Sequence, residues 1–278
     1  MTPWQADLHD AVQRGLAEAG PVEVLSVLEA QLETLATHPG TPVRPFAPET
    51  PVLGVDACSA GWVGVALGPA GRPTVHVGAT IKALVAQVRE IAEIRVVAID
   101  IPIGLPDSGG RKADLLARAA LPGKGASVFS TLTRAAYCAE TYAEGREQNL
   151  AATDDRLSAS AQAYALRAKI LDVDAWVRDS PGVVVIEAHP ELSFARMAGA
   201  PLVEPKKDPA GAQARRDALA RRGIVAPAWF SGSGFAQDDL LDACAVAWTA
   251  ARHAAGETES FPDEPEYFSD GLPAAIRV

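Results

Sequence analysis

The feature that most constrains this chain is a repeated pattern in which a short apolar run ends on an acidic residue. Val52–Val55 ends on Asp56, Ile94–Ile99 ends on Asp100, and the run that begins at Gly182 ends on Glu187. Such runs are typical of buried strands, and a carboxylate is costly to bury unless something pairs with it. Because parallel strands end at the same edge of a sheet, the three carboxylates would lie close together if these strands are parallel neighbours.

The order of the expected elements favours an α/β fold with a mixed sheet that has helices on both faces. The pattern predicts three close strands over 52–77, a helix over 80–91, a strand over 94–100, a mostly helical region over 112–178, a strand over 182–191 and helices over 208–222 and 238–255. The remaining residues, to 278, are rich in proline and glycine and finish on a short apolar stretch.

The first part of the chain is different in character. Residues 1–38 show two apolar stripes at helical spacing, which are interrupted at Gly20-Pro21. Residues 38–51 hold five prolines and predict an extended linker. We therefore divide the chain into an N-terminal helical pair with its linker, residues 1–50, and an α/β domain, residues 51–278. The helical pair is expected to pack on the domain or to form a homodimer with a second copy.

The last predicted helix adds two acids, Asp239 and Asp242, which are three residues apart and therefore share a helix face. Carboxylates held close together repel each other unless a cation lies between them, and oxygen ligands suit Mg²⁺ or Mn²⁺. Two such ions would activate a water and stabilise the leaving oxygen of a phosphodiester. The candidate metal ligands are Asp56, Asp100, Asp239 and Asp242, and the candidate catalytic residues are these four and Glu187. The competing interpretation is structural, because acids also shape turns and cap helices.

Basic residues follow the second acid-ended strand and are candidates for contacts with a substrate phosphate. Arg111, Lys124 and Arg134 belong to this series, and His189 lies two residues beyond Glu187. We consider His189 a candidate for metal ligation or for positioning the attacked phosphate. The competing interpretations are a solvated helix face for the basic residues and a structural or capping role for the histidine.

Composition and known motifs exclude several classes of protein. A formal net charge of −10 argues against a protein that coats nucleic acid electrostatically, although it permits an enzyme with a local basic strip. Three widely spaced cysteines argue against a disulfide framework or a thiolate metal site and favour a reducing cytoplasm. No apolar run approaches the roughly 20 residues that span a bilayer, and the first residues lack an apolar signal core, so we expect a cytoplasmic protein. A phosphate-binding P-loop and a G-x-S-x-G elbow are both absent from the sequence.

The chain also resembles a domain family of unknown function whose members are described as predicted RNase H-like nucleases. The resemblance is carried, in family order, by the stretches "GVDACSAGW", "AIDIPIGLP", "SVFSTLTR", "SASAQAYALRAKILDVDAW", "VIEAHPELSF", "DDLLDACAVAWTAAR" and "DGLPAAIRV". It implies an RNase H-like fold with a five-stranded mixed sheet whose second strand is antiparallel. It also implies acidic site residues at Asp56, Asp100, Asp239 and Asp242. The two acids on the last predicted helix, Asp239 and Asp242, are similar to those of the Holliday-junction-resolvase branch of the superfamily. The "E-x-H-P-E" motif gains no role from the resemblance, and residues 1–50 lie outside it.

Three functions follow as expectations. The first is a Mg²⁺- or Mn²⁺-dependent nuclease or phosphodiesterase, acting on DNA, RNA or a smaller phosphoester. The second is a non-catalytic interaction module built on the same fold. The third is an actin-like phosphotransferase that binds a nucleotide, although that class needs two such domains around its nucleotide.

Overall fold

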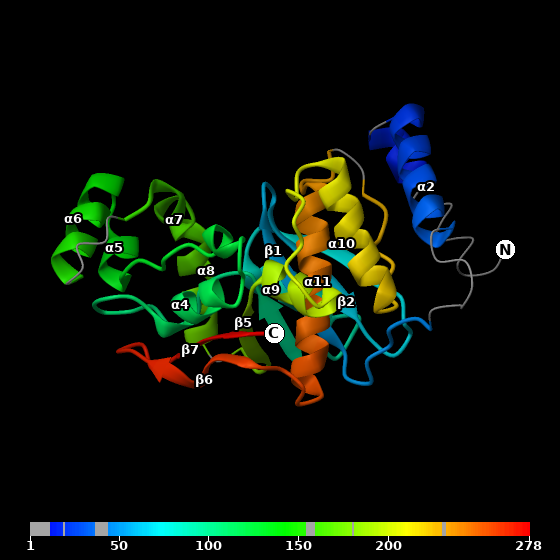
Figure 1. The fold of residues 1–278 in the computed structure, drawn as a ribbon. Coiled ribbons are helices and arrows are strands. Elements are labelled where there is room, and N and C mark those ends of the chain that lie inside the picture. The colour runs from blue at the N-terminus through cyan, green and yellow to red at the C-terminus, as the bar shows by residue number, and fades with distance from the viewer. Residues whose placement is uncertain (1–11, 19, 37–43, 154–158, 180, 230–231) are drawn as a thin grey trace.

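The computed structural model describes residues 12–18, 20–36, 44–153, 159–179, 181–229 and 232–278, and a mixed seven-stranded sheet forms its centre (Figure 1). The spatial order of the strands is β3-β2-β1-β4-β5-β7-β6. Their bounds are Val52–Cys58 for β1, Gly61–Leu67 for β2, Thr74–Gly78 for β3, Val96–Ile99 for β4, Val184–Ala188 for β5, Ser260–Tyr267 for β6 and Pro273–Arg277 for β7. Strands β1, β4, β5 and β7 run parallel, so their C-terminal ends lie at one edge.

Strand β2 is antiparallel to β1 and β3, as expected. The expectation of five strands is wrong, because the proline- and glycine-rich end of the chain adds β7 beside β5 and then β6 at the edge. Pro262 and Pro265 both lie within β6. Proline lacks the N–H that a central strand must donate, so an edge position with an irregular register accommodates these residues.

One face of the sheet is covered by three helices, α9 (Pro190–Ala198), α10 (Pro209–Arg221) and α11 (Gln237–Ala254) (Figure 1). Helix α11 packs on β1, β2 and β4. Its close approach depends on Gly54, where a Cβ atom would lie 2.1 Å from the Ala247 backbone nitrogen. The last helix of the α/β domain is therefore fixed directly against the central strand.

The opposite face packs on α3 (Ile81–Arg89) and α8 (Arg167–Arg178). Thr80 begins α3 because its hydroxyl accepts the Ala83 N–H. The helix buries Ile81, Leu84, Val85 and Val88, which follow the spacing of one helix face. The sheet therefore has a core on each side, as the element order predicts.

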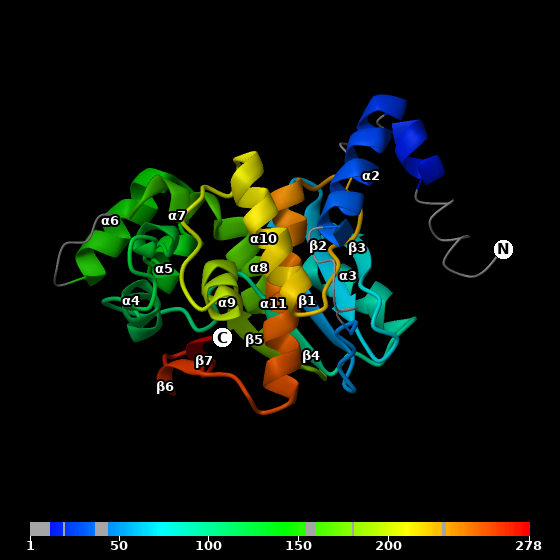
Figure 2. The ribbon, with the colours of Figure 1, turned by 45° about the vertical axis from the view of Figure 1, so that its right-hand side comes forward.

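The region 112–178 is mostly helical, as predicted. It contains α4 (Lys112–Ala119), the 3₁₀ turn Gly125–Ser127, α5 (Arg134–Cys138), α6 (Tyr142–Ala152), α7 (Ala161–Ala165) and α8. Helices α5, α6 and α7 gather at one end of the molecule, far from the N-terminal helices at the other end (Figures 1 and 2).

The N-terminal segment forms a helix over 12–18 and then α2 (Pro21–Ala36), which lies beside α10 (Figure 2). Val24 is buried, whereas Val22 and Leu25 are largely exposed. Trp4 and Leu8 of the predicted first stripe lie outside the described residues. The homodimer and the division of the chain at residue 50 stay predictions. Within the described part of the chain, no helix has the length and apolar character to cross a membrane.

Candidate functional site

Asp56 and Asp100 lie side by side at the C-terminal edge of the sheet. Val55 and Ile99 are paired in register between the parallel strands β1 and β4, and the two aspartates follow them directly. Neighbouring strands are about 4.8 Å apart, and side chains alternate between the two faces. Gly54 and Ala98 face α11, so the residues two positions later, Asp56 and Asp100, also lie on the α11 side.

Asp242 reaches the same place from α11. Its side chain is only 4% exposed, and its Oδ1 atom is buried with no hydrogen-bond partner among the described residues. Burial raises the pKa of Asp56 well above its ordinary value, and the charges of Asp100 and Asp242 raise it further. We refer to Asp56, Asp100 and Asp242 as the acidic centre.

The other two carboxyls of the acidic centre are also shifted toward their neutral forms. Burial raises the pKa of Asp100 to about 7, against the opposing effect of Lys206 and with a further contribution from Glu187 and Glu191. Burial raises the pKa of Asp242 to about 6, although Lys206 lowers it. All three carboxyls have raised pKa values, so their ionised forms are unfavourable in this place. A cation bound beside them would therefore strongly stabilise the ionised carboxylates.

A lysine contacts this group from the loop between α9 and α10. The Lys206 Nζ atom lies 2.8 Å from Asp242 Oδ2 and 3.6 Å from Asp238 Oδ2. Lys206 was not among the candidate site residues of the sequence analysis. The structure makes Lys206 the basic residue that contacts the acidic centre.

Asp239 has a different environment from Asp242. Its Oδ2 atom accepts the Ala236 N–H at 2.8 Å, which satisfies a free donor at the start of α11. Asp239 still acts electrostatically on Asp56, so it lies near the acidic centre. The hydrogen bond with Ala236 therefore supports a structural role for Asp239, and its effect on Asp56 supports a role in the site.

Glu187 lies on the other face of the sheet from the acidic centre. Ile186 and Ala188 face α11, so the alternation of β5 directs Glu187 the opposite way. Its Oε1 atom accepts from Arg111 Nη2 at 2.6 Å, and its Oε2 atom accepts from Arg111 Nη1 and the Ile103 N–H, each at 2.8 Å. Both oxygens are therefore engaged within the protein.

Arg111 was a candidate for a substrate contact, and the structure buries it instead. The residue is 1% exposed, and its guanidinium also donates to Asp114 Oδ1, at 3.0 Å from Nε and 2.7 Å from Nη2. Arg134 is similarly engaged, with Asp174 at 2.8 Å and Asp270 at 2.6 Å from its Nη2 atom. Lys124 is different, because it is half-buried and its ammonium donates a long bond, 3.4 Å, to the carbonyl of the exposed Glu204.

Sequence reasoning missed Glu191, the second glutamate of "E-x-H-P-E". Its Oε1 atom accepts from the buried Arg215, while its Oε2 atom is buried with no partner among the described residues. Glu191 also raises the pKa of both Asp100 and Asp242. The signal that could have found it is Pro190, because proline favours the first helical position and places Glu191 in the first turn of α9.

His189 precedes α9 and lines a small cavity with Asp100 and Glu187. The cavity measures about 20 Å³, which is room for one water. The His189 Nε2 atom lies 3.4 Å from the Ser127 carbonyl, and Nδ1 is buried with no partner among the described residues. Burial lowers the pKa of His189, which favours the neutral ring. A neutral imidazole beside Asp100 is able to accept a proton or hold a water.

The side chains as they stand do not form a complete metal site: within the described ranges, no three His, Cys, Asp or Glu residues are arranged to hold an ion. The donor chemistry nevertheless suits a hard cation, because the acidic centre offers carboxylate oxygens and Asp242 Oδ1 lacks a partner. The Lys206 ammonium lies where such a cation would interact with Asp242.

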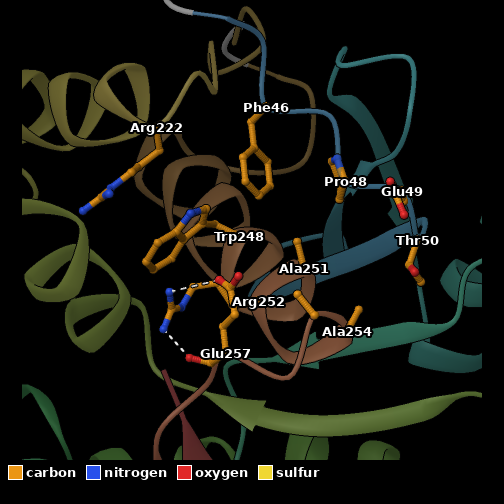
Figure 3. Close-up of a pocket in the computed structure, with 11 residues that line it drawn as sticks. Phe46, Pro48, Glu49, Thr50, Arg222, Trp248, Ala251, Arg252, Ala254 and Glu257 are labelled. Carbon is orange, nitrogen blue, oxygen red and sulfur yellow. Dashed lines mark hydrogen bonds and ion pairs between the residues drawn. The ribbon is translucent and has the colours of Figure 1, made fainter.

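A larger hollow of about 490 Å³ lies at the other end of α11 (Figure 3). Phe46, Pro48 and Thr50 form one wall, and Trp248 with Ala251 and Ala254 forms another (Figure 3). The guanidinium carbons of Arg252 and Arg222 lie 4.9 Å and 5.6 Å from the centre of the Trp248 ring. Among the described residues that line this hollow there is no strand-end acid and no histidine, so the acidic centre is the better candidate for chemistry.

The fold and the site together define an α/β protein with convergent, buried carboxylates at the C-terminal edge of its sheet. A family model described as "Protein of unknown function (DUF429)" matches residues 54–267, and the chain belongs to this family. Comparison with curated proteins and with solved structures found no match.

Proposed function

We propose that this protein is a metal-dependent hydrolase of phosphodiester bonds, with an RNase H-like nuclease as the specific form. The observation that carries the proposal is the acidic centre, in which β1 and α11 each contribute one buried carboxylate and Asp100, directly after β4, contributes a half-buried one. The resemblance of the sequence to predicted RNase H-like nucleases supports the specific form. The partial strand order β3-β2-β1-β4-β5, with β2 antiparallel, agrees with the sheet that this resemblance implies.

In this proposal Asp56, Asp100 and Asp242 hold Mg²⁺ or Mn²⁺, and Asp239 supports them electrostatically. A divalent ion bound there supplies Lewis acidity toward a phosphoryl oxygen and lowers the pKa of a bound water. His189 lies beside Asp100 in the small cavity and is suited to orient a water through its Nδ1 atom. Its place next to the carboxylates favours a role in chemistry over a purely structural role.

Substrate binding in this proposal depends on a local contact and not on the overall charge of −10. The half-buried Lys124, whose ammonium makes a long bond to the Glu204 carbonyl and not an ion pair with a carboxylate in the described residues, is the member of the predicted basic series that is best placed to contact a phosphate. Arg111 and Arg134 are committed to carboxylates of the protein and position the fold around the site. DNA, RNA and smaller phosphoesters are all compatible with one such contact.

The test is hydrolysis of single- and double-stranded DNA and RNA and of bis(p-nitrophenyl) phosphate, each with Mg²⁺ or Mn²⁺. We expect cleavage of at least one substrate that needs the metal and is lost in Asp56→Asn. Asp107→Asn is the matched control, because Asp107 is exposed and bonds Ser269 away from the acidic centre. Activity that survives Asp56→Asn, or bound metal without cleavage of any substrate, contradicts the proposal.

A second function has its own supporting observation. Lys206 and the Ala236 N–H already pair with Asp242 and Asp239, and the described residues contain no preformed set of three metal ligands. These pairings favour a non-catalytic interaction module in which the acids are structural. Bound metal without cleavage of any of these substrates favours this module, whereas metal-dependent cleavage that is lost in Asp56→Asn decides against it.

A further inference from the structure

Lys206 contacts the acidic centre but has no role in the proposed function. We propose that its ammonium is an exchangeable internal cation, which pairs with Asp242 until a divalent metal takes its place. The inference rests on the proposed metal site and adds its regulation, because the Lys206 ammonium and the metal would compete for Asp242.

The contacts of Lys206 suit exchange. Its Nζ atom lies 2.8 Å from Asp242 Oδ2, which is a normal charge-assisted hydrogen bond. The Lys206 side chain is 40% exposed, whereas the Asp242 side chain is 4% exposed. The ammonium can therefore return to water, where it is well solvated, while the carboxylate cannot leave the centre.

The backbone that carries Lys206 is held in place. A Cβ atom at Gly211 would lie 1.9 Å from the Pro205 carbonyl oxygen, so the first turn of α10 touches the loop directly before Lys206. The Asp208 N–H also donates to the Pro205 carbonyl at 3.1 Å. Exchange then needs only a rotation of the long, flexible lysine side chain and no movement of the loop.

One ammonium leaves part of the site unsatisfied. Asp242 Oδ1 and Glu191 Oε2 are both buried without a hydrogen-bond partner among the described residues. A buried acceptor without a donor is unfavourable, and a lysine contributes a single charge and three donors. A divalent ion carries twice the charge of an ammonium and binds more oxygen ligands. Such an ion is therefore suited to bind the two oxygens that Lys206 leaves without a partner.

The charges around the site support the same conclusion. Lys206 acts electrostatically on Asp56, Asp100, Asp239 and Asp242 together. Glu187 and Glu191, which also act on Asp100, have separate cations, because they pair with the buried Arg111 and Arg215. Lys206 and an incoming metal therefore compete for the same carboxylates.

The experiment compares Mn²⁺ binding by calorimetry in the full chain and in Lys206→Met. Removal of the competing cation is expected to make Mn²⁺ binding about tenfold tighter. Lys207→Met is the matched control, because Lys207 is exposed, comes from the same loop and carries the same charge. We expect Lys207→Met to bind Mn²⁺ within about twofold of the unmodified chain, since Lys207 acts on Asp239 as an exposed charge that solvent and salt screen.

Lys206→Gln provides a second variant, which keeps a hydrogen-bond donor for Asp242 but loses the charge. Its Mn²⁺ affinity is expected to lie between those of the unmodified chain and Lys206→Met. Equal or weaker Mn²⁺ binding in both folded Lys206 variants overturns the inference and leaves the proposed function standing. Absence of Mn²⁺ binding at millimolar concentration in every form, Lys206→Met included, overturns the proposed function together with the inference.

Discussion

Replacement of Arg111 by methionine is expected to lower the free energy of unfolding by about 3–5 kcal/mol, because it leaves buried carboxylates without their cation. The Arg111 side chain is 0% exposed, and the side chains of Glu187 and Asp114 are each 6% exposed. Methionine fills a similar space, so the loss reflects charge and hydrogen bonding more than a cavity.

The magnitude follows from the contacts that are lost. Arg111 makes two bonds to Glu187, at 2.6 Å and 2.8 Å, and two to Asp114, at 2.7 Å and 3.0 Å. It also donates to the Ile103 carbonyl at 3.0 Å. The remaining donors, the Ile103 N–H for Glu187 and the Thr131 N–H and hydroxyl for Asp114, do not neutralise either carboxylate. Two buried charges without a counterion place the cost at the upper part of the range for a broken buried pair.

The assay is urea unfolding at pH 7, followed by circular dichroism, with a thermal scan in parallel. The expected loss corresponds to a fall in melting temperature of about 6–20 °C. Arg95→Met is the control, because Arg95 pairs with Glu93 at 3.0 Å on the surface, with side chains 69% and 86% exposed. An exposed pair of this kind contributes about 1 kcal/mol or less. A loss in Arg111→Met no larger than that of the control would refute the reasoning, and weaker substrate binding at unchanged stability would favour the substrate-contact role.

Two further predictions concern packing and thiol chemistry. Gly54→Ala is expected to lower the free energy of unfolding in urea by about 3 kcal/mol or more, because a Cβ atom there would lie 2.1 Å from the Ala247 nitrogen. Gly68→Ala is the control, since the atom nearest to a Cβ there lies 3.8 Å away. An equal loss of stability in both variants would contradict this prediction. Under native conditions a thiol reagent is expected to label the exposed Cys138 and not the buried Cys244, since burial raises the pKa of Cys244 to about 12. Mass spectrometry of peptides checks this, and equal labelling would show that α11 opens.

The sequence predicted the strands that are continuous apolar runs, because a local pattern is enough to mark them. β1, β4 and β5 all fall within the predicted ranges. It missed β6 and β7, since prolines at 262 and 265 interrupt any apolar run and the pairing of β7 with β5 joins residues far apart in the chain. Whether such a segment pairs depends on tertiary contacts and not on its own pattern.

The same limit applies to the candidate site. The three acid-ended strands look equivalent in the sequence, although Glu187 lies on the other face of the sheet from Asp56 and Asp100. The face of Glu187 is fixed by its register with Ile99 and by burial of its neighbours, which only the fold provides. Arg111 looked like a solvated charge because its partner Glu187 is 76 residues away.

The most direct test of the central claim is anomalous diffraction from crystals soaked in Mn²⁺. The account predicts a peak coordinated by oxygens of Asp56, Asp100 and Asp242, with the Lys206 ammonium withdrawn from Asp242. Two catalytic metals lie roughly 3.5–4 Å apart, so carboxylates more than about 8 Å apart are unable to share them. Absence of a peak at the acidic centre, or Lys206 still bonded to Asp242 with Mn²⁺ bound elsewhere, would contradict the account.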